Sequence, residues 1–123
     1  SGLLQRFMDR EISAITPQIL QDLRSEILEG MAKHAPTGQV IIDKMPLNFR
    51  WIGFICAALP EARIIHLNRD PMAVAWSLYR HLFAGLENGF SNSMEDIARF
   101  MVLHSELMTF WKGVCTAQVL KPI

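Results

Sequence analysis

Apolar residues recur along this chain with two different spacings, one typical of helices and one typical of strands. Spacings of three and four residues place side chains on one face of a helix, whereas short β-branched runs favour buried strands. Thr16 and Ser93 stand where helix N-caps are expected, and Pro17 suits a first helical turn. We therefore predict helices over about 3–8, 17–34, 47–59, 72–83 and 94–111, and strands over 39–42, 62–67 and 118–120.

The order of these segments predicts the fold class. A strand, a helix, a second strand and a second helix follow one another between residues 39 and 83. Such an order predicts an α/β fold with a short parallel sheet flanked by helices, rich in helix overall. A turn is expected at Pro36-Thr37-Gly38 and a loop over 85–92. No internal repeat or low-complexity tract interrupts the sequence, so residues 1–123 are interpreted as one domain.

The composition of the chain argues against several classes of function. Twelve basic and twelve acidic residues cancel, so net charge gives no argument for a nucleic-acid partner or a membrane surface. The longest apolar run, Trp51–Leu59, is far shorter than the roughly 20 residues that span a bilayer, and no signal segment opens the chain. Cys56 and Cys115 lack metal-ligand spacing, and the four histidines form no metal-binding pair. We expect a cytoplasmic protein without a bound metal.

Basic residues follow two of the predicted strands. Lys44 comes after the first strand and Arg69 after the second. Ligands of open α/β sheets bind outside the carboxyl ends of the strands, where helix N-termini also attract anions. Arg50, in the first turn of the predicted helix over 47–59, opposes the helix dipole unless an anion or a carboxylate compensates it. An ordinary salt bridge to Asp43 or Glu61 is the alternative interpretation of Lys44.

The helix that starts after Arg69 carries a second polar candidate. Asp70-Pro71 is an ordinary helix start, so Asp70 is expected to be a structural N-cap. Ala73 and Ser77 are four residues apart and share one helix face, where the small alanine leaves room for a ligand. Arg69 and Ser77 can therefore hold one phosphate from two sides. The alternative is that the Ser77 hydroxyl bonds back to the carbonyl of Ala73.

The central segments resemble a known family. The stretches 43–49, 59–66 and 69–71, together with Gly53 and Ser77, are similar to the bacterial sulfotransferases often fused to tetratricopeptide repeats, which are relatives of the protein-tyrosine sulfotransferases. The similarity is dense over 39–83 and looser up to Trp111. The combined pattern is specific, although each piece alone is common.

The resemblance implies a P-loop-like fold and transfer of a sulfuryl group from 3′-phosphoadenylyl sulfate to a hydroxyl or amine acceptor. In that family the arginine of the RDP-like turn and the serine eight residues later bind the 3′-phosphate, which here implies Arg69 and Ser77. The lysine of the strand-end turn lies near the bridging oxygen of the donor, which implies a catalytic role for Lys44.

Other parts of the family pattern have no counterpart in this sequence. The first strand with its loop around the 5′-phosphosulfate is absent, as are the general base from that region and the Tyr-Glu-Asp-like segment after the last strand. We therefore expect a partial sulfotransferase domain that binds the donor, or adenosine 3′,5′-bisphosphate, but is inactive as this fragment. The alternative is a non-catalytic helical interaction module derived from a sulfotransferase. The uncovered edges of an incomplete sheet make a homodimer one candidate assembly.

Overall fold

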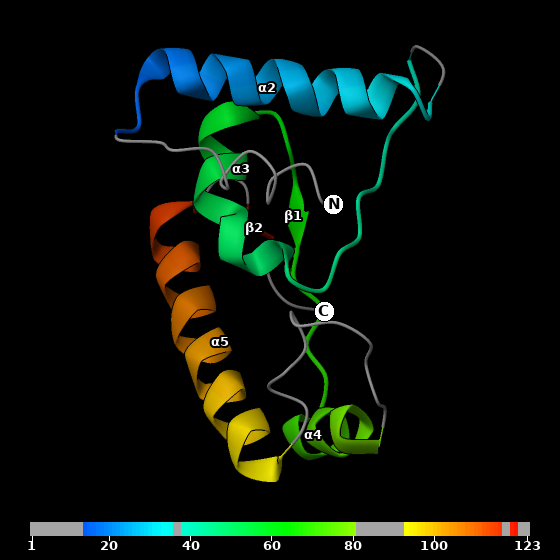
Figure 1. The fold of residues 1–123 in the computed structure, drawn as a ribbon, viewed down its shortest axis with the longest axis vertical. Coiled ribbons are helices and arrows are strands. Elements are labelled where there is room, and N and C mark those ends of the chain that lie inside the picture. The colour runs from blue at the N-terminus through cyan, green and yellow to red at the C-terminus, as the bar shows by residue number, and fades with distance from the viewer. Residues whose placement is uncertain (1–13, 36–37, 81–92, 117–118, 121–123) are drawn as a thin grey trace. The chain divides into compact units, whose positions relative to one another are not determined.

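A computed structural model describes residues 14–35, 38–80, 93–116 and 119–120 (Figure 1). The chain divides into two compact units, Ser1–Ala62 and Arg63–Ile123, which are described one at a time. The helix expected over 3–8 and the loop expected over 85–92 lie outside the described residues, as does most of the turn expected before Gly38. That residues 1–123 form one domain stays a prediction.

The first unit is built on two helices. Helix α2 spans Pro17–Ala32, and Thr16 caps it by accepting a hydrogen bond from the backbone N–H of Ile19 at 3.3 Å, as expected from the sequence. The expected helix over 47–59 forms in two parts, a 3₁₀ turn η1 at Asn48–Trp51 followed by helix α3 at Ile52–Ala58. The helices predicted over 17–34 and 47–59 are therefore confirmed.

Apolar side chains of α2 and α3 meet in one core. Leu23 is fully buried, and Ile27 packs with it against Ala58 and Leu59 at the end of α3. Arg24 lies at the edge of this core, and its guanidinium donates a hydrogen bond to the carbonyl of Ala58 at 3.0 Å. This bond stabilises the C-terminal end of α3. The partly buried residues around the core are Ile19, Met31, Trp51, Phe54, Ile55 and Ala62.

The strand predicted over 39–42 is wrong. These residues have no regular secondary structure, and the side chains of Val40 and Ile42 are 92% and 86% exposed. A β-branched run forms a strand only where a neighbouring strand supplies hydrogen-bond partners and covers its faces. Within the described residues the paired strands are β1 and β2, and residues 39–42 form no ladder.

The second unit contains a short parallel pair of strands. Strand β1, Ile64–Ile65, pairs in parallel with β2, Val119–Leu120, with Ile64 opposite Val119. Both strands fall inside predicted strand segments, although β1 is shorter than the expected 62–67. The parallel arrangement agrees with the predicted α/β order, while the chain as described is dominated by helices. A P-loop-like sheet stays a proposal.

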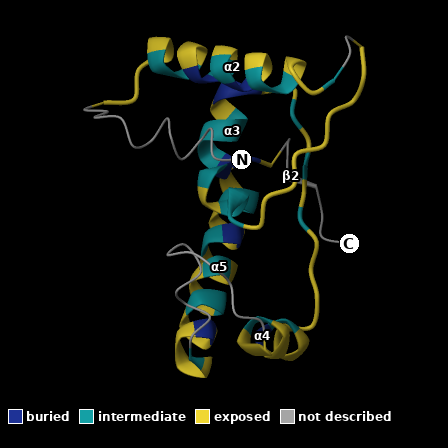
Figure 2. Ribbon diagram, turned by 45° about the vertical axis from the view of Figure 1, so that its right-hand side comes forward, coloured by how far each residue is buried: buried dark blue, intermediate teal, exposed yellow. Residues whose placement is uncertain are grey.

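Two helices connect these strands. Helix α4 spans Pro71–Arg80 and packs against α5, which spans Met94–Val114. Ser93 caps α5 as predicted, because its hydroxyl accepts from the backbone N–H of Asp96 at 3.0 Å. Buried side chains of this unit are Ala75 on α4 and Ile97, Met108 and Cys115 on or beside α5 (Figure 2). None of the helices in the described part of the chain is long and apolar enough to cross a bilayer.

Candidate anion site on helix α4

Helix α4 starts as the sequence predicts. The carboxylate of Asp70 accepts a hydrogen bond from the backbone N–H of Ala73 at 2.8 Å, and the carbonyl of Asp70 accepts from Val74 at 3.0 Å. Asp70 is therefore the N-cap, which confirms its structural role. Pro71 has no N–H, so most backbone donors of this first turn are already used. Any anion at this helix start depends on side chains.

Arg69 stands directly before that cap. Its side chain is exposed, and within the described ranges no carboxylate pairs with it. Because its preceding residues 66–68 have no regular secondary structure, the arginine sits in the turn between β1 and α4, as expected. A guanidinium exposed in such a turn is available to a phosphate or sulfate group.

Ser77 lies on α4 and is also exposed. It is one turn after Ala73 on the same helix face, and about 9 Å along the axis from Pro71 at 1.5 Å per residue. That placement agrees with the predicted face. Whether Arg69 and Ser77 together hold one anion stays a prediction.

Lys44 belongs to the first unit, in the segment before η1. Its side chain is exposed, and neither of the two expected salt-bridge partners is bound to it. The carboxylate of Glu61 instead accepts hydrogen bonds from both terminal nitrogens of Arg24, at 2.6 and 2.9 Å. Asp43 accepts from the side-chain amide of Asn48 at 3.0 Å, and this bond closes the turn around Lys44. This hydrogen bond holds the turn in place, and the ammonium of Lys44 is exposed to solvent.

Arg50 has a different environment from Lys44. It lies in η1, and its guanidinium carbon stands 5.3 Å from the centre of the Trp51 ring, within the range of a cation–π contact. The electron-rich ring offsets part of the cost of a cation in a first helical turn. An anion bound at Arg50 therefore has less support than one bound at Arg69.

An open pocket of about 370 Å³ lies between α2 and α3, lined by Pro17, Leu20, Gln21, Arg24, Ala57, Ala58, Pro60 and Glu61. The cation of this pocket is Arg24, whose guanidinium is engaged by Glu61 and by a helix carbonyl. The neighbouring guanidinium lowers the pKa of the Glu61 carboxyl, mainly by hydrogen bonding. These groups satisfy one another, so the pocket offers a ligand little beyond apolar surface.

His66 and His104 form a pair that the sequence does not reveal. Their ring centres are 5.5 Å apart, and the Nδ1 atom of His66 is buried without a hydrogen-bond partner among the described residues. Burial lowers the pKa of both imidazoles, and the charge of Lys112 lowers them further. The two histidines are distant in sequence, so no local spacing could have predicted their contact. His81 lies outside the described residues.

Metal ligands show no comparable grouping. Within the described ranges, no three residues of the histidine, cysteine, aspartate or glutamate types are placed to share an ion. Cys56 is half-buried and Cys115 is buried, both as free thiols. The site candidates expected from the sequence, Lys44, Arg69 and Ser77, are two cations and a hydroxyl, groups that bind anions.

Comparisons with known proteins agree with this chemistry. The sequence model of the sulfotransferase family matches residues 3–121. A protein of Aquifex aeolicus (strain VF5), described as an uncharacterized protein, is 30% identical over 104 residues. The match covers 83% of this chain and 14% of that protein, so the chain spans a small part of its relative's length. No solved structure matches this chain.

Proposed function

Because the chain belongs to the sulfotransferase family, we propose that it binds 3′-phosphoadenylyl sulfate, or the product adenosine 3′,5′-bisphosphate. Family membership supports sulfuryl transfer in general, with a nucleotide donor and a separate acceptor. The proposed reaction moves the sulfuryl group to a hydroxyl or amine. Since the chain spans 14% of its relative, the activity of any longer protein is part of this proposal.

One observation carries the proposal: Arg69 is exposed and has no ion-pair partner among the described residues, directly before the helix that bears Ser77. Asp70 caps that helix and so fixes the backbone next to the arginine. A guanidinium can bind two phosphate oxygens at once, and a hydroxyl can donate to a third. We assign the 3′-phosphate of the nucleotide to Arg69 and Ser77.

Lys44 has a separate proposed role. When the sulfuryl group leaves the donor, negative charge grows on the oxygen that bridged it to the nucleotide phosphate. A cation aimed at that oxygen stabilises the transition state more than the bound donor. The exposed ammonium of Lys44 and the Asp43–Asn48 hydrogen bond that closes its turn support this role.

Calorimetric titration with adenosine 3′,5′-bisphosphate tests the proposal. Arg69→Ala should weaken binding about tenfold or more, since a hydrogen bond to a charged group contributes about 1.5–3 kcal/mol. Arg99→Ala is the matched control, because Arg99 is an exposed arginine already paired with Glu95 at 2.6 Å. Equal affinity of the Arg69→Ala variant and the parent protein would reject the assignment. A parent protein that binds no nucleotide would favour the non-catalytic helical interaction module.

The branch of the family, the cellular setting and the oligomeric state are part of the same proposal. The segment Asp43-Lys44-Met45-Pro46 supports the bacterial branch associated with tetratricopeptide repeats. The free thiols of Cys56 and Cys115 support a reducing, cytoplasmic setting. A homodimer is proposed on the exposed apolar side chains of α5, among them Leu103, Phe110 and Val114.

A further inference from the structure

Helix α4 leaves two large aromatic side chains in solvent. Trp76 is 56% exposed and Tyr79 is 48% exposed, and their rings stack with centres 6.2 Å apart and planes inclined by 30°. The helix packs on α5 through other positions, since Ala75 is buried and Val74 and Leu78 are half-buried. Figure 2 shows most of α4 as exposed. The aromatic pair therefore belongs to the open side of this helix.

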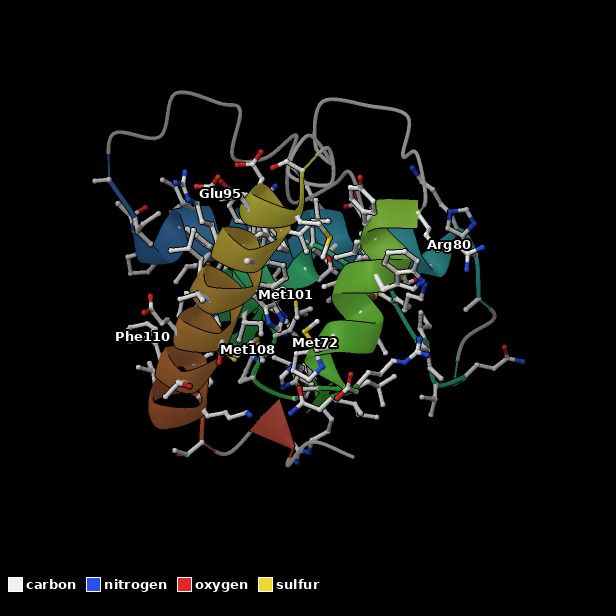
Figure 3. The ribbon with its side chains drawn as sticks, turned by 90° about the horizontal axis from the view of Figure 1, so that it is seen from below. Met72, Arg80, Glu95, Met101, Met108 and Phe110 are labelled. Carbon is white, nitrogen blue, oxygen red and sulfur yellow. The ribbon has the colours of Figure 1, made fainter. Side chains whose placement is uncertain are left out.

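The open side of α4 also carries positive charge and no negative charge. Between Pro71 and Arg80 the helix has no aspartate or glutamate. Arg80 ends the helix, opposite Met72 at its start (Figure 3), and it has no ion-pair partner within the described ranges. At 3.6 residues per turn, Arg80 falls between Trp76 and Ser77 around the helix axis. The aromatic ring of Trp76, the cation of Arg80 and the hydroxyl of Ser77 thus lie next to one another around the helix axis.

We propose that Trp76 stacks on the adenine base of the nucleotide, with Tyr79 supporting the indole from behind. This inference rests on the proposed function, in which Arg69 and Ser77 hold the 3′-phosphate. A nucleoside 3′-phosphate carries its base and its phosphate on one ribose ring, so neighbouring side chains can take one each. Aromatic platforms beside cations are the usual means of binding a base and its phosphates, because every base has a π-face.

Stacking needs little reorganisation here. The indole is already held against the phenol ring, which limits the rotamer freedom that binding would remove. In the proposed complex, the guanidinium of Arg80 binds the ribose or a second phosphate. The purine is thereby selected by contact area and the phosphate by charge.

The test uses two ligands, adenosine 3′,5′-bisphosphate and base-free ribose 3,5-bisphosphate, each titrated into the 123-residue chain. Trp76→Ala should weaken binding of the adenosine ligand about tenfold, the scale of one stacked base, and leave the base-free ligand within twofold. Trp76→Phe keeps a ring and should lose less. Leu28→Ala is the control, since Leu28 is a large apolar residue that is 42% exposed on α2.

The outcomes separate this inference from the proposed function. If Arg69→Ala weakens both ligands while Trp76→Ala weakens neither, the phosphate site stands and the stacking inference is overturned. Equal weakening of both ligands by Trp76→Ala also overturns it, because loss of the base contact cannot affect a ligand without a base. If the parent chain binds neither ligand, both ideas fail. Circular dichroism of each variant checks that the helices persist.

Discussion

The imidazole rings of His66 and His104 lie 5.5 Å apart and are inclined by 56°, which joins the residue after β1 to the middle of α5. Burial, then the charge of Lys112, then His104 lower the pKa of His66 below its usual 6.5. Burial and Lys112 also lower the pKa of His104. Both rings therefore favour the neutral form in the folded chain.

This pair predicts a loss of stability in mild acid. The unfolded chain takes up protons near pH 6.5, whereas the folded chain resists them until lower pH. The stabilising contribution is thus complete above about pH 6.5 and is lost as pH falls through the lowered pKa values. Urea unfolding at pH 7.5 and 5.0 should show this loss, and His104→Phe should reduce it. His34→Gln, at an exposed histidine, is the control. The same pH dependence in His104→Phe and the parent would contradict the assignment.

Asp70 is predicted to stabilise the start of α4 as its N-cap. Asp70→Ala removes the acceptor for the N–H of Ala73 and should lower the free energy of unfolding by about 1 kcal/mol. Asp70→Asn keeps an oxygen in that position and should retain most of the stability. Chemical denaturation measures both variants. An equal loss in the asparagine and alanine variants would show that the charge, and not the capping oxygen, matters.

Lys44 is predicted to act on the rate and not on donor affinity. In a longer, active protein that contains this chain, Lys44→Ala should lower turnover about 10²-fold or more, the scale for losing one charge stabiliser of the transition state. Donor affinity should fall far less, because the charge that the lysine stabilises develops during the reaction. Steady-state kinetics with labelled donor, together with donor binding, separate the two effects. Unchanged turnover in a folded variant would reduce Lys44 to a structural residue.

Local signals predicted the helices well. Thr16, Asp70 and Ser93 each cap a helix as expected, because a capping side chain and the backbone it satisfies are only three residues apart. The strand expected over 39–42 failed for the opposite reason. Val40 and Ile42 have suitable side chains, but a ladder depends on a distant partner that the segment itself cannot specify.

The candidate site shows the same division. The position of Arg69 before a capped helix, with Ser77 along that helix, follows from spacing and could be predicted. The pairing of Arg24 with Glu61 could not, since it depends on how α2 and α3 pack. It nevertheless bears on the salt-bridge alternative for Lys44, because Glu61 is engaged by Arg24.

The 3′-phosphate itself gives the most direct test of the account. Adenosine 3′,5′-bisphosphate and adenosine 5′-monophosphate differ by that group alone, so the ratio of their affinities isolates its contact with the protein. We predict that the parent chain prefers the bisphosphate about tenfold or more, on the scale of a charge-assisted hydrogen bond. Arg69→Ala should remove most of that preference, whereas Arg99→Ala should keep it. A preference that survives intact in Arg69→Ala would contradict the account.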